Sequence, residues 1–399
     1  MNQDLVTPPH VKPEQIVDFD IFAEASLQDN PHRGYRALHA TAPDIFYTPR
    51  NGGHWVVTRF AQMAQILRDP QHFSSRELTI PKSNSDNVML PLNLDPPEHT
   101  PYRAVLMRHF DRKVIAAMEP TLRAWAARLI EPVAPAGRCD FSENLGAAFP
   151  VSIFMELLGV PLERFEELRA IVKEYFSRTT NARYIELQNT MIAIFTELAE
   201  ERRRAPKDDL ISKLLAETVN GRPLTLQELQ SIGFLLFLGG LDTVANALTF
   251  AFHNLAQRPD VQARLVAEPE KIPDFVEESL RCFGIVHQTR IVKQDIEIAG
   301  VQFREGDMVS CALPLAGLDD RCNPDPDRFD IDRQNREHIV FSTGAHLCIG
   351  AALARAEMRV FTEEWLKRIP VFALAPGVKL DWRAGQVMAL MNLPLQWPT

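Results

Sequence analysis

One cysteine stands where its sulfur could ligate a metal ion. Cys348 lies between Gly344 and Gly350, and the residues after it repeat an apolar face at spacings of four, three and four: Ala354, Met358, Phe361 and Trp365. This period predicts a helix, so we expect Cys348 in a loop just before a helix N-terminus. The N–H groups and the helix dipole favour a thiolate there, and the two glycines let the backbone turn tightly against a flat ligand. Without further context, a lone cysteine is more often a small buried apolar residue.

The spacing around the cysteine is more specific than the cysteine itself. Residues 341–350, Phe-x-x-Gly-x-His-x-Cys-x-Gly, resemble the haem-binding loop of the cytochrome P450 family, in which a cysteine thiolate ligates the haem iron. The resemblance implies that Cys348 is the metal ligand of a haem b group (iron protoporphyrin IX), and that Gly239 and Phe341 contact this cofactor. It also implies a mainly α, single large P450-type fold with a long central helix and small β-sheets. The haem would be buried between that helix and the cysteine loop.

A long apolar stretch supplies the predicted central helix. Thr225 and Glu228 form a capping-box pattern, residues 232–238 are almost all apolar, and Arg258-Pro259 ends the pattern. We therefore expect a helix of about 30 residues, roughly 45 Å long. Because it is apolar on all sides, it should lie inside the protein.

Gly239-Gly240-Leu241-Asp242-Thr243 interrupts this helix. Two glycines cost a helix about 1 kcal/mol each relative to alanine, and the acid and the alcohol need partners at that depth. One interpretation is a kink in which Thr243 bonds the carbonyl one turn back. The P450 resemblance implies a catalytic role, in which Thr243 stabilises oxygen bound beside it and Asp242 helps to deliver the two protons that dioxygen cleavage requires.

Four basic side chains match positions that bind haem propionates in the family. His99 and Arg103 are four residues apart and would share one face of a helix. Arg290 lies in a strand-like segment, and His346 lies in the cysteine loop. Taken singly, each could equally be an exposed polar residue.

Glu278 and Arg281 form an acid–base pair at a spacing of three, which on a helix is usually a surface salt bridge. The pair also matches the Glu-x-x-Arg motif of the family, and residues 323–329 resemble the segment that supplies a second arginine. The resemblance therefore implies a buried structural network of Glu278, Arg281 and Arg328.

The chain has no Gly-x-Gly-x-x-Gly motif and no length left for a flavin module, so electrons must come from another protein. The resemblance implies a [2Fe-2S] ferredoxin with a NAD(P)H-dependent reductase. The positive face formed by Arg103, Arg108, Arg112 and Lys113 is a candidate docking surface, although such a stripe is usually only solvated.

Within the family, the chain is most similar to the camphor hydroxylase group, but residues 80–94 contain no tyrosine to hydrogen-bond a ketone. Asn87 lies near the equivalent place and could donate instead. The expected substrate pocket is mostly apolar, although each residue could equally be plain core: Thr79, Asn87, Leu92, Leu235, Leu238, Val286, Val387 and Met388. Such a lining suits a small terpenoid or norisoprenoid, for example an ionone or a monoterpene.

Composition bears on the class of ligand, the location of the protein and its number of domains. The net charge of −9 argues against nucleic acid binding, and five scattered cysteines without a Cys-x-x-Cys pair fit a reducing, cytoplasmic location. The N-terminus has no basic and apolar leader, and the near-apolar run 232–241 is too short for a bilayer, so no membrane span is expected. We expect one domain over residues 1–399, with residues 1–15 flexible.

The elements that position these residues follow from local patterns. A strand is expected at 54–58, a helix at 60–67, an irregular segment at 80–97, mainly helices from 98 to 260, and strands at 290–298 and 301–309.

The interpretation is a haem-thiolate monooxygenase that inserts one oxygen atom of O2 into a C–H bond. The alternatives are a peroxide-driven haem hydroxylase, a dehydrating relative and a non-catalytic haem-thiolate gas sensor.

Overall fold

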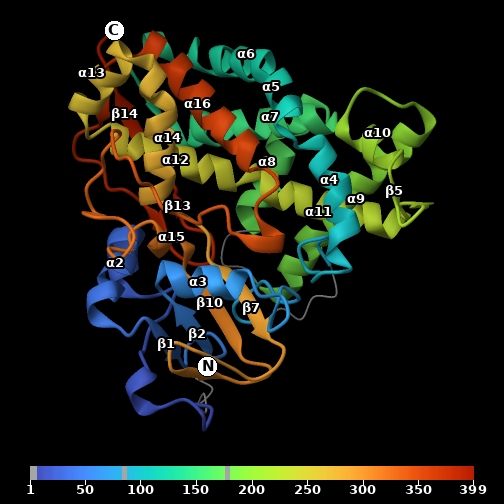
Figure 1. Ribbon diagram of the computed structural model, residues 1–399. Helices are drawn as coiled ribbons and strands as arrows, with labels where there is room; N and C mark the ends of the chain where they lie inside the picture. The colour runs from blue at the N-terminus through green and yellow to red at the C-terminus, as the bar shows by residue number, and fades with distance from the viewer. Residues whose placement is uncertain (1–6, 83–87, 176–179) are drawn as a thin grey trace.

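The computed structural model describes residues 7–82, 88–175 and 180–399, and the chain is mainly helical, as the sequence predicts (Figure 1). The helices are α1 (Ala25–Asp29), α2 (Pro31–Thr41), α3 (Phe60–Leu67), α4 (His99–His109), α5 (Arg112–Ala117), α6 (Glu119–Ile130), α7 (Ala148–Leu158), α8 (Phe165–Tyr175), α9 (Asn181–Arg204), α10 (Leu210–Leu215), α11 (Leu226–Leu241), α12 (Thr243–Leu255), α13 (Pro259–Ala267), α14 (Ile272–Cys282), α15 (Leu313–Ala316) and α16 (Ala351–Arg368).

The strands are short and form small sheets. They are β1 (Ile45–Thr48), β2 (His54–Val57), β3 (Phe73–Ser74), β4 (Arg138–Asp140), β5 (Thr218–Val219), β6 (Arg222–Pro223), β7 (Gln288–Val292), β8 (Ile296–Ile298), β9 (Val301–Phe303), β10 (Met308–Cys311), β11 (Ala373–Leu374), β12 (Trp382–Arg383), β13 (Ala389–Leu390) and β14 (Pro394–Gln396). The largest sheet has the order β1-β2-β10-β7-β3, with β2 and β10 parallel and the other neighbours antiparallel. This sheet holds β7, and therefore Arg290, at a fixed position.

Local sequence signals account well for the N-terminal part of this sheet. The predicted strand is β2 and the predicted helix is α3, and Asn51, Gly52 and Gly53 all have positive φ in the turn between β1 and β2. The segment expected as two strands at 290–309 is four, because Ala299 and Gly300 turn the chain between β8 and β9 and a further turn precedes β10.

Part of the N-terminal segment expected to be flexible contacts the largest sheet. Residues 1–6 lie outside the described chain, and within residues 7–15 His10 and Val11 contact the sheet region while Pro9 and residues 12–14 are exposed. Val11 is buried, and His10 Nε2 lies 2.8 Å from a carboxylate oxygen of Asp307, which also accepts the indole N–H of Trp55. A short 3-10 helix then covers Pro13–Gln15.

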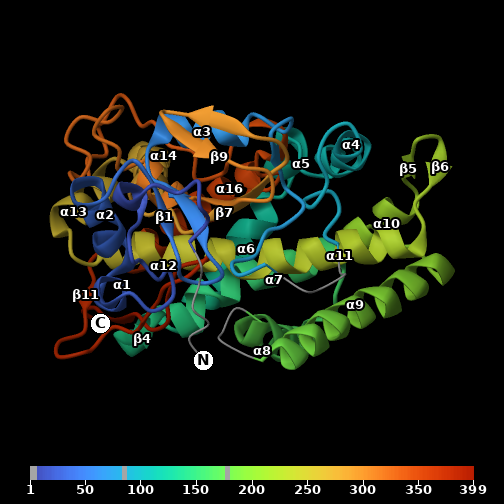
Figure 2. The same cartoon turned by 90° about the horizontal axis from the view of Figure 1, so that it is seen from below.

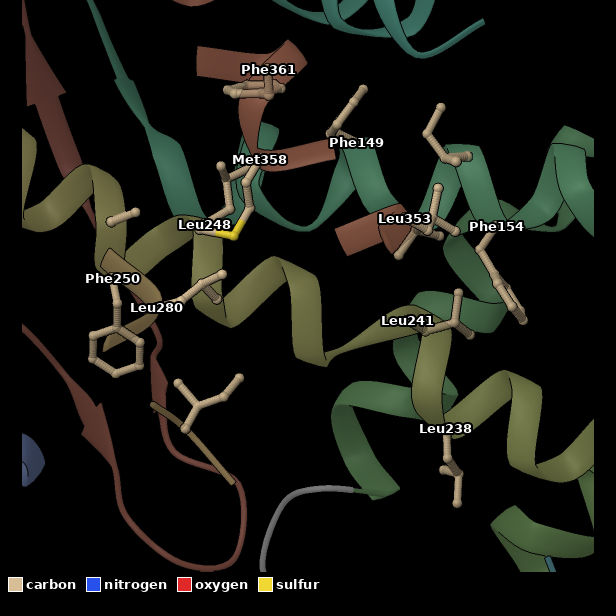
Figure 3. Packing of buried hydrophobic residues seen from close by; sticks show 14 of the residues in the cluster. Phe149, Phe154, Leu238, Leu241, Leu248, Phe250, Leu280, Leu353, Met358 and Phe361 are labelled. Atoms are coloured by element: carbon tan, nitrogen blue, oxygen red, sulfur yellow. The ribbon is translucent and has the colours of Figure 1, made fainter. Parts of the chain in front are cut away.

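Helices α11 and α12 run through the centre of the molecule, with α9 beside α11 and α16 beside α12 (Figure 2). Figure 3 shows Leu238 and Leu241 on one side of the junction between the two helices and Leu248 on the other, with Leu353 of α16 nearby. Residues Leu226–Leu255 together have the length and composition of a membrane span, contrary to the expectation from the shorter apolar run. Most of that surface is buried inside the protein, as in a core helix.

Candidate active site

The central helix is broken at the predicted place. The Thr225–Glu228 capping box starts α11, which ends at Leu241, and Asp242, with φ −119° and ψ −36°, separates α11 from α12. The hydroxyl of Thr243 donates to the carbonyl oxygen of Gly239 at 2.8 Å. The hydrogen bond of the kink interpretation is therefore present, and Asp242 separates α11 from α12 at the same place.

The two glycines before the break serve different purposes. A Cβ atom on Gly240 would lie 2.3 Å from the ring of Phe154, so glycine is needed there for packing of α11 against α7. A Cβ atom on Gly239 would meet nothing within 4 Å, and Gly239 is exposed although it lies in the central helix. Open space therefore borders α11 one turn before Thr243.

The cysteine loop turns sharply before α16. Ser342 and Gly344 have φ of 66° and 70°, and the N–H of Cys348 donates to the carbonyl oxygen of Phe341 at 2.8 Å. The Cys348 side chain lies deep within the protein, yet its surface is accessible, as expected of a group that lines an internal space. Burial raises the pKa of the Cys348 thiol, whereas the Gly350 N–H and the charge of Arg103 act in the opposite direction. The thiol is thus available to a ligand that brings its own positive charge.

Four basic residues from three elements converge near this loop. The rings of His99 of α4 and His346 lie with their centroids 4.5 Å apart and their planes tilted by 57°. Burial, reinforced by the charge of Arg290, lowers the pKa of His346 to about 3. Arg290 is 2% exposed and donates Nη1 to the Thr289 carbonyl at 2.7 Å. Arg103 also acts on His346 through its charge and donates to the Leu347 carbonyl.

Three nitrogen atoms of this group have no hydrogen-bond partner among the described residues: Arg290 Nη2, His99 Nε2 and His346 Nε2. Leaving buried donors unpaired is costly, particularly on a charged group. An anionic ligand would satisfy all three, and a haem places two carboxylates at its rim. The donors, the accessible thiol and the open space beside Gly239 together fit a haem group.

A cavity of about 70 Å³ lies beside the helix break and is lined by equal numbers of polar and apolar residues. Its polar lining residues are Ser142, Glu143, Asp242, Asn246, Thr249 and Arg383. The volume is sufficient for water, and the lining offers hydrogen-bond partners. Asp242 Oδ2 lies 2.9 Å from Arg383 Nη2. Burial raises the pKa of Asp242, and the charge of Arg383 opposes that rise. Asp242 thus lines the cavity and directly precedes Thr243, the residue that begins α12.

Comparison with known proteins decides the family. The family model described as Cytochrome P450 matches residues 141–379, more than half of the chain. The chain belongs to the cytochrome P450 family. Probable cytochrome P450 127A1 of Sinorhizobium fredii is 34% identical over 400 residues, covering 98% of this chain and 96% of the relative. Nocardicin C N-oxygenase of Nocardia uniformis is 32% identical and covers 92% and 95%. The crystal structure of CYP101J2 has a TM-score of 0.91 at 33% identity, with 100% of both chains covered.

These comparisons confirm the predicted family, fold and cofactor. This P450 is a haem-thiolate monooxygenase with haem b as its cofactor, and the likeness to CYP101J2 supports the camphor-type group. Its relatives are bacterial P450s.

The expected substrate-pocket residues are only partly where the sequence places them. Leu92, Leu235, Val286 and Val387 are half-buried, and a β-bridge pairs Val286 with Val387. Leu238 is 8% exposed, and Met388 is wrong as a lining residue because its side chain is fully buried in the core. Asn87 lies outside the described residues. The Thr79 hydroxyl is directed to its own loop, since it donates to Glu77 Oε1 at 2.9 Å.

The structural network contains a different third arginine from the predicted one. Glu278 and Arg281 are fully buried and joined by two hydrogen bonds of 2.7 and 2.9 Å. Arg328 is wrong as a member, because its side chain is 70% exposed and pairs with Asp330. Arg333 takes the place instead, with Nε 3.2 Å from Glu278 Oε1. The sequence pattern located the segment but not which of its arginines turns inward.

The proposed docking residues are not one uniform positive stripe. Arg103 donates to the Leu347 carbonyl, and Arg108 pairs with Glu217 at 2.6 Å. Arg112 and Lys113, at the start of α5, are exposed. The surface charge available to a partner is therefore concentrated on the first turn of α5.

Sequence reasoning missed Arg383. It lies in β12, 141 residues from Asp242 in the chain, and only the fold brings the two together. No local motif marks it, because one arginine in a short strand resembles any surface cation.

Proposed function

We propose that this P450 hydroxylates an unactivated C–H bond of a small hydrophobic substrate, a terpenoid or norisoprenoid such as an ionone or a monoterpene. Electrons come from a separate [2Fe-2S] ferredoxin and a NAD(P)H-dependent reductase. The enzyme works in the cytoplasm, and residues 1–399 form one domain. The observation that carries this proposal is the break at Asp242. Asp242 lines the cavity there, and the Thr243 hydroxyl donates to the carbonyl of Gly239, beside which space is open.

The roles proposed for the residues follow from that geometry. Cys348 would be the axial ligand, and Arg103, Arg290, His99 and His346 would bind the propionates. When bound, the haem supplies the activation of dioxygen.

The acid–alcohol pair would manage the protons. The Asp242 carboxyl, with its raised pKa, can exchange a proton with water in the cavity once Oδ2 leaves Arg383 Nη2. The Thr243 hydroxyl, held toward the Gly239 carbonyl, can pass a proton from Oγ1 to a group in the open space. A hydroxyl and a cavity-linked acid are what a dioxygen-using enzyme needs.

One comparison separates this function from its rivals. The purified protein is incubated with a terpenoid panel, first with NAD(P)H, reductase and ferredoxin, and then with hydrogen peroxide alone. Hydroxylated product only in the first reaction supports the proposal. Product with peroxide alone indicates a peroxide-driven hydroxylase, a dehydrated product indicates a dehydrating relative, and no product in either reaction indicates a gas sensor.

The docking part of the proposal has a separate test. Reversing the charge at Arg112 and Lys113 should slow electron transfer from the ferredoxin at low salt. An unchanged rate would remove these residues from the docking surface.

A further inference from the structure

The side chain of Gln386 ties together segments that lie far apart in the chain. Its Oε1 accepts from the Ile80 N–H at 3.0 Å, and its Nε2 donates to the Leu78 carbonyl at 2.6 Å and to the Thr289 hydroxyl at 3.3 Å. The Thr289 hydroxyl in turn donates to the Leu78 carbonyl at 3.1 Å. The amide of Gln386 therefore has protein partners for its oxygen and for both of its hydrogens, so it serves to hold these segments and not to bind a ligand.

The backbone of Gln386 flanks a contact between two valines. Val286 and Val387 form an antiparallel β-bridge. Two backbone N–H···O=C hydrogen bonds, both 2.8 Å long, lie on either side of this bridge: His287 to Gln386 and Met388 to Ile285. Such bonds enclose a non-hydrogen-bonded pair, in which the two side chains point to the same side and lie close together. We call Val286 and Val387 the valine pair.

The valine pair lies on the side of its strand that faces the cysteine loop. Successive residues of an extended chain point to opposite sides, so Val286 shares a side with Gln288 and Arg290 of β7. Gln288 Oε1 accepts from the Ser342 hydroxyl of the cysteine loop at 2.6 Å, and the charge of Arg290 acts on the histidine of that loop. The valine pair is therefore turned toward the part of the fold that carries Cys348.

The amide of Gln386 lies behind the valine pair. Thr289 alternates with Gln288 and Arg290 along β7, so its side chain points away from the cysteine loop, and Gln386 contacts it there. We propose that Gln386 is a positioning residue that holds the valine pair as a fixed wall of the substrate pocket. This inference rests on the proposed function, in which both valines line that pocket. Small displacements of such a wall decide which ligand fits and how it is oriented.

The test compares imidazole with 4-phenylimidazole. Both bind the ferric haem iron through a ring nitrogen, but only the second extends a ring toward the pocket wall. The shift of the Soret band gives the two dissociation constants, and we expect the wild-type protein to prefer 4-phenylimidazole. Gln386→Leu keeps a similar volume but removes all three side-chain hydrogen bonds, and it should lower that preference about three- to tenfold.

Gln262→Leu is the matched control, because Gln262 makes the same kind of amide clamp elsewhere. Its Nε2 donates to the carbonyls of Leu255 and Phe372 at 2.7 and 2.9 Å, and its Oε1 accepts from the Phe372 N–H at 3.0 Å. These bonds join α13 to the end of α12 and to the residue before β11. Gln262→Leu should lower the urea midpoint as Gln386→Leu does, but it should keep the wild-type preference for 4-phenylimidazole.

The ferrous CO spectrum of each variant reports whether the haem site is intact. If Gln386→Leu does not fold, Thr289→Val, which removes one partner of the Gln386 amide, should lower the preference in the same direction. An unchanged preference in folded Gln386→Leu, or in Thr289→Val where Gln386→Leu does not fold, overturns this inference, and so does an equal loss in Gln262→Leu. The two azoles need no turnover, so their result stands apart from the proposed function. A wild-type protein that oxidises no terpenoid with the ferredoxin system contradicts the proposed function instead.

Discussion

Arg333 contacts Glu278, whereas Arg328, five positions earlier in the same segment, does not. This difference between two neighbouring arginines can be tested directly. Arg333 is almost buried, and beyond Glu278 it donates to the carbonyl oxygens of Asp325 at 2.8 Å and Arg328 at 2.9 Å. Arg328 is mostly exposed, and its nearest acid, Asp330, is 3.3 Å away. Alanine substitution should therefore have very different effects at the two positions.

The expected magnitudes follow from burial. Removing one partner from a buried charge network costs about 3–5 kcal/mol. Glu278 would keep two hydrogen bonds from Arg281 and one from the Asp330 N–H, so we expect Arg333→Ala to cost about 3 kcal/mol, at the lower end of that range. Arg328→Ala removes an exposed pair worth about 0–1 kcal/mol. A loss of about 3 kcal/mol is a large part of the stability of a typical domain.

Urea unfolding followed by circular dichroism and by the Soret band measures both variants against the wild-type protein. Because a cofactor protein need not unfold in two states, the comparison uses the shift of the midpoint under one set of conditions. Arg333→Ala should shift the midpoint strongly and lose haem at lower urea, and Arg328→Ala should unfold like the wild type. A larger shift for Arg328→Ala would refute the assignment of Arg333 to the network.

The remaining predictions concern proton transfer and acid stability. Thr243→Ala should consume oxygen as fast as the wild type but release much of it as hydrogen peroxide. Asp242→Asn should slow oxygen consumption itself. Equal peroxide yields in Thr243→Ala and wild type would contradict the role of the hydroxyl. Burial lowers the pKa of His32 to about 4 and that of His287 to about 3, so both are neutral when folded while the unfolded chain protonates near pH 6.5. Stability should therefore be complete above pH 6.5 and fall between pH 6.5 and 4, by up to about 1.4 kcal/mol per pH unit for each histidine; a urea midpoint that is constant from pH 7 to pH 5 would exclude this.

Short-range sequence signals located most of the elements around the site. The Thr225–Glu228 capping box and the double glycine predict both the start and the interruption of the central helix, because caps and breaks are set by neighbouring residues. The motif around Cys348 predicts the haem loop for the same reason. The family resemblance also names the residues that converge on it, Arg290 and His99 among them.

The sequence fails where a side chain's direction depends on distant packing. Arg328 and Arg333 are equivalent by composition, and only the turns after Asp325 decide which one reaches Glu278. Arg383 pairs with Asp242 through the fold of the C-terminal strands, and Met388 packs into the core although its neighbour Val387 is half-buried. Such choices are made by tertiary contacts and leave no local pattern.

The ferrous CO spectrum of Cys348→His tests the central claim most directly. The wild-type protein and a Cys322→Ser control should both show the red-shifted Soret band that a thiolate ligand gives, because the sulfur of Cys322 lies near the carbonyls of Ala316 and Asp319 instead. Cys348→His should bind haem but lose that band. A red-shifted band that survives in Cys348→His would show that another residue ligates the iron, and the account of this site would be wrong.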